Sequence, residues 1–269
     1  MTSRIESAFA KVKQQSRSAL VTYITAGDPS PTASLPYMQA LVDAGADVIE
    51  LGMPFSDPMA DGPVIQRASE RALAAGMSLA KVLETVEGFR QHDSETPVVL
   101  MGYLNPIESM GYAEFAERAS SAGVDGVLIV DSPPEESHDL NAILRRYNLD
   151  QIFLVSPNSS ERRIKAVSDL GSGFVYYVSV KGVTGSATLD VAEVAERVSH
   201  FRSDVDLPIG VGFGVKTGED AAAVAGVSDA VIIGSAIVEV VEQAGDNFAL
   251  GCDSLRAKVT TYSEAVAQA

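Results

Sequence analysis

Short apolar runs rich in β-branched residues recur along the chain, and longer segments of helical periodicity separate them. Such runs are typical of buried strands, and their alternation with helical segments predicts repeated βα units around a parallel sheet. Eight runs can be counted, at Ala19–Thr25, Asp47–Leu51, Pro97–Tyr103, Gly126–Val130, Gln151–Val155, Phe174–Ser179, Pro208–Phe213 and Asp229–Ile233. Most begin roughly 20 to 35 residues after the previous one, which is close to the length of one βα unit.

Eight units of this size need about 250 residues. The chain of 269 residues therefore predicts an α/β fold, a closed (β/α)8 TIM barrel, as a single domain over residues 1–269. An open doubly wound sheet is the alternative, because periodicity does not show closure. Residues Ser3–Glu6 look like a capping box, opening a helix whose Ile5, Phe9 and Val12 could plug the barrel bottom. The long interval between the second and third runs predicts an insertion after strand 2.

Composition restricts the class of function. A formal net charge of -16 argues against a nucleic-acid partner, since phosphate backbones are bound by basic surfaces. The acidic residues are spread along the chain, which fits solvated helix faces or adaptation to a salty cytoplasm. No segment approaches the roughly 18 to 20 apolar residues that span a bilayer, and the start of the chain lacks an apolar signal core, so we expect a soluble, cytoplasmic protein without a membrane partner. One cysteine and three scattered histidines predict neither a disulfide nor a metal site.

Two carboxylates lie around one loop after the second run. In a closed parallel barrel the site forms at the carboxyl ends of the strands. Glu50 ends the second strand, and the proline-broken loop after it carries Asp61. Carboxylates in different environments can titrate apart and divide acid and base work. The structural alternatives are a Glu50 carboxylate tied to a neighbouring amide and an Asp61 in an ordinary turn.

Other polar residues also stand at or near strand ends. Tyr176 lies within the sixth run, where plain packing is the alternative reading. Asn105 follows the third run and Asp131 the fourth, and Asp131 could simply cap the following helix.

Three glycine-rich loops follow late strands, at Lys181–Ser186, Gly210–Gly214 and Gly234–Ser235. Backbone N–H groups in such loops bind a phosphate without any basic side chain, and this fold often has a phosphate site after strands seven and eight. Turns needed only for chain reversal are the alternative.

Several of these segments together resemble the signature segments of the tryptophan synthase alpha chain family. They are Glu50–Pro63, Tyr23–Pro29, Gly182–Gly185, Gly212–Gly214 and Gly234–Ile237. The first of these segments is far more specific to the family than the glycine motifs. The resemblance runs from the N-terminal helix to the last strand. It implies a carbon–carbon lyase of tryptophan biosynthesis, which cleaves indole-3-glycerol phosphate to indole and glyceraldehyde 3-phosphate by a retro-aldol reaction without a metal or organic cofactor.

The resemblance also implies residue roles. Glu50 would be the acid/base catalyst, Asp61 would accept a hydrogen bond from the indole N–H, and Tyr176 would be auxiliary. The substrate would be bound by Tyr23 and Tyr103 around the indole, and by Gly185, Phe213, Gly214, Gly234 and Ser235 at the phosphate. Residues 181–189 would form a lid, from which Thr184 could reach Asp61. Departures from the family pattern are modest, at Met53, Met59 and Ser132, and none removes a catalytic group.

The family resemblance further implies a partner. A beta chain, in an α2β2 tetramer, would bind pyridoxal phosphate and receive the indole, and Pro54–Asp61 and Asn105–Gly111 would form part of the contact. Three other functions stay open at this point: a free-standing indole-releasing lyase, another phosphate-binding barrel such as a sugar-phosphate isomerase, and a weakly catalytic subunit that mainly activates its partner.

Overall fold

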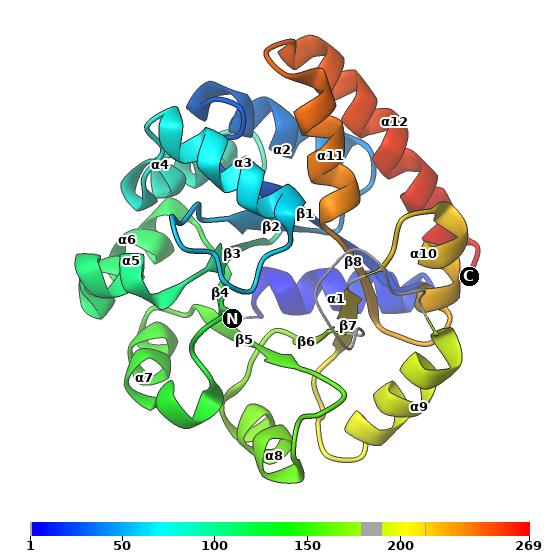
Figure 1. Cartoon of the computed structure of the whole chain (residues 1–269). Coiled ribbons are helices and arrows are strands. Elements are labelled where there is room, and N and C mark those ends of the chain that lie inside the picture. The colour runs from blue at the N-terminus through cyan, green and yellow to red at the C-terminus, as the bar shows by residue number, and fades with distance from the viewer. Residues whose placement is uncertain (1, 179–189, 213) are drawn as a thin grey trace.

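Eight parallel strands close into a barrel in the computed structural model, which describes residues 2–178, 190–212 and 214–269 (Figure 1). The strands are β1 (Ala19–Thr25), β2 (Val48–Gly52), β3 (Val98–Gly102), β4 (Gly126–Ile129), β5 (Asp150–Val155), β6 (Val175–Val178), β7 (Ile209–Gly212) and β8 (Ala230–Ile233). Each strand pairs with the next along the chain, and β8 pairs with β1. The predicted closed barrel is confirmed, and the open sheet is excluded.

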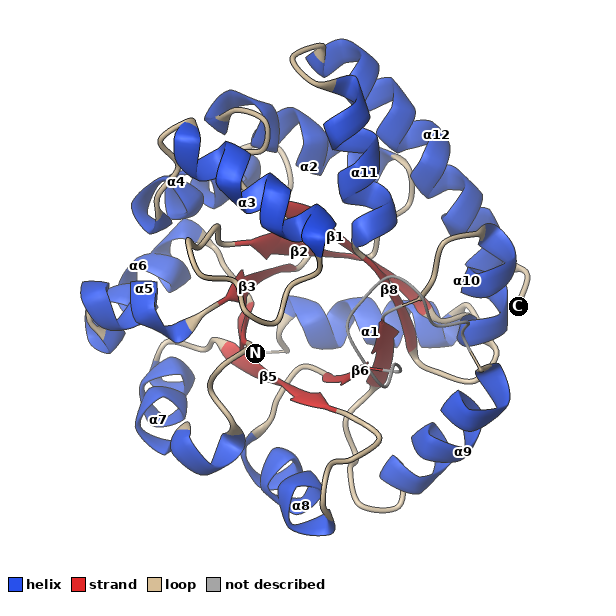
Figure 2. Ribbon diagram, viewed as in Figure 1, coloured by secondary structure: helices blue, strands red, loops and turns tan. Residues whose placement is uncertain are grey.

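Helices surround the strands, with the first helix across one end of the barrel and the others in a ring outside it (Figure 2). They are α1 (Arg4–Gln14), α2 (Ser34–Asp43), α3 (Pro63–Ala74), α4 (Leu79–Arg90), α5 (Leu104–Met110), α6 (Tyr112–Ala122), α7 (His138–Arg146), α8 (Glu161–Leu170), α9 (Val191–Phe201), α10 (Gly218–Ala225), α11 (Ser235–Ala244) and α12 (Phe248–Ala267), with short 3-10 turns at Pro31–Ala33 and Pro134–Glu136. The predicted insertion after strand 2 is confirmed, since both α3 and α4 lie between β2 and β3. No helix among the described residues is long and apolar enough to cross a membrane.

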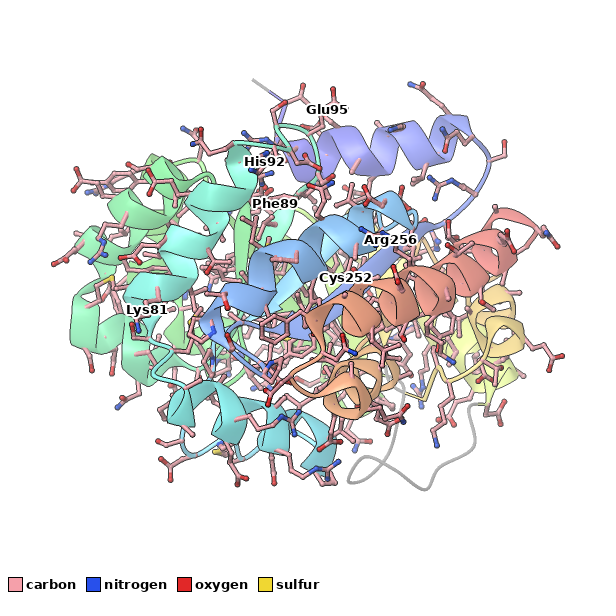
Figure 3. All side chains as sticks on the ribbon, turned by 90° about the horizontal axis from the view of Figure 1, so that it is seen from above. Lys81, Phe89, His92, Glu95, Cys252 and Arg256 are labelled. Carbon is pink, nitrogen blue, oxygen red and sulfur yellow. The ribbon has the colours of Figure 1, made fainter. Side chains whose placement is uncertain are left out.

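Helix α1 closes the amino-terminal end of the barrel. The Ser3 side chain accepts a hydrogen bond of 3.1 Å from the Glu6 N–H, which confirms the predicted start of this helix. Ile5, Phe9 and Val12 are buried in one cluster with the side chains of the barrel interior, and the Phe9 ring lies 5.7 Å from that of Phe174. Figure 3 shows α1 at one end of the barrel and α3 at the other. The barrel is therefore open only at the end where α3 lies.

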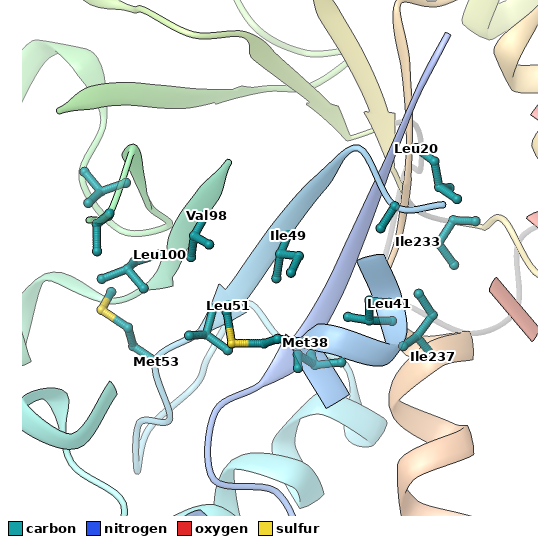
Figure 4. Close-up of a cluster of buried hydrophobic side chains, with 14 of the residues drawn as sticks. Leu20, Met38, Leu41, Ile49, Leu51, Met53, Val98, Leu100, Ile233 and Ile237 are labelled. Carbon is teal, nitrogen blue, oxygen red and sulfur yellow. The ribbon is translucent and has the colours of Figure 1, made fainter. Parts of the chain in front are cut away.

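Side chains of the strands alternate between the helices and the barrel interior. On β2, Ile49 and Leu51 face outward into the cluster that contains Met38 of α2, as Figure 4 shows. Val48, one position away, belongs to the interior cluster. Because successive side chains on a strand point to opposite faces, Glu50 shares the inward face with Val48.

Aspartates just before three strands brace the amino-terminal end of the barrel. Asp47 accepts a hydrogen bond from the Leu20 N–H, Asp125 one from the Val98 N–H and Asp229 one from the Ile209 N–H, each at 2.8 Å. Each amide begins or nearly begins the preceding strand, so each aspartate joins two neighbouring strands. Each of these aspartates also pairs with arginine, and Asp125 binds both Arg4 and Arg90.

We predict that Asp125→Ala lowers the free energy of unfolding by about 3 kcal/mol, because it leaves the largely buried Arg90 guanidinium without its carboxylate and the Val98 N–H without an acceptor. Urea denaturation followed by circular dichroism measures this loss. Glu114→Ala, at an exposed position of α6, is the control and should change the value by less than about 0.5 kcal/mol. Equal effects of the two substitutions would contradict the bracing role.

Candidate functional site

A cavity of about 600 Å³ lies at the open, carboxyl-terminal end of the barrel. It is lined by Tyr23, Glu50, Asp61, Gly62, Pro63, Val64, Ile65, Met101, Tyr176, Gly214, Val215, Lys216, Ile232, Gly234, Ser235, Ala236, Glu239, Val240, Gln243 and Lys258. Seven of these lining residues are site residues predicted from the sequence, and they come from five separate segments of the chain. They are Tyr23, Glu50, Asp61, Tyr176, Gly214, Gly234 and Ser235.

Strand register places three of these residues inside the barrel mouth. Tyr23 of β1 lies directly opposite Glu50 of β2, and Tyr176 lies on the interior face of β6. Gly52 and Gly212 are next to the two tyrosines, and a Cβ atom at either glycine would collide with the hydroxyl of Tyr23 or of Tyr176, respectively. The absence of side chains at these two positions makes room for the tyrosine rings.

Glu50 is a buried carboxyl at the barrel mouth. Its exposed fraction is 1%, and its Oε1 atom has no hydrogen-bond partner within the described part of the chain. The alternative considered from the sequence, a Glu50 carboxylate bound by a neighbouring amide, is therefore not supported by any hydrogen bond to Oε1 from the described residues. Burial disfavours the charged form and raises the pKa of Glu50 to about 8. The side chain can thus hold a proton at neutral pH and still give it up.

Asp61 lies in a different environment, on the loop before α3. Its Oδ2 atom accepts a hydrogen bond of 3.2 Å from the Tyr103 hydroxyl, which in turn accepts one of 3.0 Å from the Ala60 N–H. The ring of Phe55 stacks on that of Tyr103 at 5.2 Å. Burial raises the pKa of Asp61 to about 6, and the bond from Tyr103 opposes this rise. At neutral pH Asp61 is mostly ionised while Glu50 is mostly protonated.

Tyr176 and Tyr23 stay protonated beside these carboxyls. Burial, and then the negative charges of Glu50 and Asp61, raise the pKa of Tyr176 well above its ordinary value. The pKa of Tyr23 is also raised, chiefly by burial, and its hydroxyl lies 3.2 Å from the Thr25 hydroxyl oxygen. Both hydroxyls can therefore act as hydrogen-bond donors over the whole working range of pH.

Another part of the cavity wall is formed by glycine-rich backbone at the start of α11 and after β7. Helix α11 begins at Ser235, with Gly234 as its N-cap, and both residues line the cavity together with Ala236. The first N–H groups of a helix have no partner within the helix and favour an anion. Gly214, whose φ of +84° suits glycine, approaches from the loop after β7. These backbone groups are suited to binding a phosphate group.

Some predicted site residues do not line the cavity or are not described. Tyr103 contributes through its bond to Asp61 instead of by lining the cavity. Thr184, Gly185, Phe213 and the lid segment of residues 181–189 lie outside the described residues.

The prediction for Asp131 as a cap of the following helix was wrong. Its Oδ1 atom accepts a hydrogen bond of 2.8 Å from the N–H of Leu104, the first residue of α5. Asp131, after β4, therefore caps a helix that precedes it in the chain and that begins after the neighbouring β3. Asn105 lies within that same helix, outside the cavity lining.

The structure adds residues that the sequence reasoning missed, and these include all the basic side chains in the lining. Lys216 follows Gly214 by two residues, so the glycine loop was a usable signal for it. Lys258 comes from α12, and its Nζ atom lies 3.4 Å from the Lys216 carbonyl oxygen. No local pattern marks Lys258, because only closure of the barrel brings α12 to this place. Among the described residues, no group of His, Cys, Asp and Glu side chains is arranged to hold a metal ion.

Comparisons with known proteins agree on one family. A family model described as tryptophan synthase alpha chain matches residues 9–267. A tryptophan synthase alpha chain of Methylococcus capsulatus is 59% identical over 244 residues, which cover 91% of each chain, and one of Nitrosococcus oceani is 54% identical over 98% of this chain and 97% of that one. The crystal structure of tryptophan synthase subunit alpha from Legionella pneumophila has a TM-score of 0.92 at 41% identity, with both chains fully covered. A structure of tryptophan synthase from Mycobacterium tuberculosis has a TM-score of 0.90 at 36% identity, with 99% of each chain covered.

The buried carboxyl of Glu50 predicts a pH-dependent cost to stability. Its pKa of about 8 in the folded protein exceeds the value of about 4.3 in an unfolded chain, so folding favours the proton. The cost is absent below about pH 4, grows as the pH rises, and is complete above about pH 8. We therefore expect Glu50→Gln to be more stable than the parent by up to about 5 kcal/mol at pH 9, with little difference at pH 4.5. Urea denaturation at both pH values measures this, and a difference independent of pH would contradict the unpaired burial.

Proposed function

The chain belongs to the tryptophan synthase alpha chain family, and we propose that Glu50 and Asp61 divide the acid–base work of this family's reaction at the barrel mouth. The chain is a carbon–carbon lyase of tryptophan biosynthesis, which cleaves indole-3-glycerol phosphate to indole and glyceraldehyde 3-phosphate. The observation that supports the assignment of roles is the contrast between the two carboxyls: Glu50 is buried, which favours its neutral form, whereas Asp61 accepts a hydrogen bond from Tyr103, which favours its charged form.

The retro-aldol reaction needs two proton transfers and one stabilised charge. In the proposed mechanism, protonated Glu50 gives its proton to the indole carbon that bears the side chain. The resulting positive charge on the ring nitrogen is stabilised by Asp61, which accepts the hydrogen bond of the indole N–H. Glu50, now a carboxylate, takes the proton of the neighbouring side-chain hydroxyl. The carbon–carbon bond then breaks, its electrons restore the indole ring, and the hydroxyl carbon becomes the aldehyde.

The rest of the cavity fits the two ends of this substrate. Met101, Ile232 and Tyr23 give the flat apolar surface that an indole ring requires. Backbone N–H groups at Gly214, Gly234 and Ser235 would hold the phosphate, with Thr184, Gly185 and Phe213 as further predicted contacts. Tyr176 would act as an auxiliary donor near the reacting carbon. In this proposal the chain uses no metal and no organic cofactor of its own.

Alpha chains of this family work with a beta chain. We place the contact at the loop Pro54–Asp61 and at α5, which begins directly after Tyr103. Met59 in that loop has an exposed fraction of 85%, unusual for a large apolar side chain, and a partner surface would cover it. Pyridoxal phosphate would belong to the beta chain of an α2β2 tetramer. The whole of residues 1–269 would act as one domain in the cytoplasm.

The deciding experiment is an assay of indole release from indole-3-glycerol phosphate, with and without an added beta chain. Release that needs the beta chain supports the alpha-subunit reading, and full activity without it supports the free-standing lyase.

Glu50→Gln should lose about 10²- to 10⁴-fold in kcat because it can neither give nor take the proton. Asp61→Asn should also be severe, whereas Tyr176→Phe should keep part of the activity. Glu114→Gln on α6 is a matched control, and near-normal turnover by Glu50→Gln would sink the assignment.

The two carboxyls also predict a bell-shaped dependence of kcat/KM on pH. Activity should rise through about pH 6 as Asp61 ionises and fall through about pH 8 as Glu50 loses its proton. Tyr103→Phe removes the hydrogen bond that lowers the pKa of Asp61, so it should move only the acidic limb, toward higher pH. The measurement is kcat/KM for indole-3-glycerol phosphate from pH 5 to 10. An acidic limb that stays in place in Tyr103→Phe would show that Asp61 is not the group that titrates there.

A further inference from the structure

Four charged side chains form one network outside the cavity. Arg71 donates to both carboxylate oxygens of Asp28, at 2.7 and 2.9 Å, and its remaining Nη1 atom donates to Glu242 at 2.8 Å. Arg67 donates to both oxygens of the same Glu242, at 2.7 Å each. Glu242 therefore bridges two arginines, and Arg71 bridges two carboxylates.

The network joins three segments that carry different parts of the proposed site. Both arginines lie on α3, which begins two residues after Asp61. Glu242 lies on α11, whose first residue is Ser235 at the proposed phosphate end. Asp28 lies in the loop after β1, five residues beyond Tyr23. Figure 1 shows α3 and α11 side by side at the barrel mouth, and the ion pairs confirm that they touch.

The geometry of the network restricts how α3 and α11 lie relative to each other. The carboxylate of Asp28 has an exposed side-chain fraction of 2% and is bound by the planar fork of Arg71, a contact that fixes both distance and angle. The guanidinium of Arg71 is itself only 30% exposed. With two of its donors held by Asp28, Arg71 presents its third donor in a fixed direction, which favours one position of Glu242, and so of α11, along α3. A loose surface ion pair would not impose such a restriction.

We propose that Arg71 and Glu242 are positioning residues that couple the phosphate end of the site to the Asp61 end. The inference rests on the proposed function, in which the substrate must touch both ends at once. Phosphate bound at the start of α11 stabilises that helix, Glu242 transmits its position to α3, and the start of α3 holds Asp61 at the correct distance from the indole ring. A ligand of the phosphate end alone passes its ordering to α3 but has nothing there to bind, whereas a substrate that spans both ends also gains the correct placement of Asp61.

The test compares a ligand of one end with the whole substrate. Glu242→Gln weakens both links between α3 and α11 and leaves the buried Asp28–Arg71 pair in place, so the variant should fold. The affinity for inorganic phosphate, measured by calorimetry, should stay within about twofold of the parent. The kcat for indole-3-glycerol phosphate, with the beta chain present, should fall about fivefold or more. Arg71→Lys, which keeps the charge but loses the fork, should show the same split, and Glu114→Gln should show no change.

Hydrogen exchange supplies a readout that a purely structural role would not change. In the parent, inorganic phosphate should slow amide exchange in the first turn of α11 and also in the first turn of α3. In Glu242→Gln it should slow exchange only in α11. Equal slowing of α3 in both proteins, or a kcat within about twofold of the parent, would overturn the coupling. A parent that fails to cleave the substrate would contradict the proposed function instead, and the exchange experiment would still decide the coupling.

Discussion

Burial of one unpaired carboxyl is the constraint on which the site depends. Glu50 can hold a proton at neutral pH only while its surroundings stay dry and apolar. The closed barrel supplies these surroundings, because strand alternation turns Glu50 inward and α1 seals the opposite end. Tyr23 and Tyr176 line the cavity with Glu50, their hydroxyls close to Gly52 and Gly212, and burial is the one cause of the raised pKa that the described residues give. The fold thus accepts a local loss of stability at the residue that we propose as the proton donor.

The two carboxyls differ because the chain holds them in different ways. Glu50 belongs to a strand and cannot turn toward water, whereas Asp61 lies on a loop where Tyr103 can stabilise its charge. The proposed division of labour between acid and anion therefore follows from the placement of the two side chains. The same loop is exposed at Met59, so the anion is held by the least enclosed part of the site.

The sequence predicted the barrel well, because each strand leaves a local signal in its run of apolar residues. It also predicted Glu50, Asp61 and Tyr176 as neighbours, since strand ends meet at one face of a barrel. It could not predict contacts that depend on how distant helices pack. The approach of Lys258 to the cavity, the partner of Asp131 and the meeting of Arg71 with Glu242 have no local signature. Predictions for Thr184, Gly185 and Phe213 remain predictions, because these residues lie outside the described part.

The seal formed by α1 has a consequence for the order of assembly. Phe9 packs on Phe174, and Arg4 binds Asp125, 121 positions later in the chain, so the first helix finds its partners late in the chain. When the protein is made on a ribosome, the apolar face of α1 emerges before the strands, and its binding surface is complete only after β6 has emerged. The cluster that Ile5, Phe9 and Val12 form with the barrel interior can therefore be completed only after more than half of the barrel has been synthesised, although α1 itself precedes every strand.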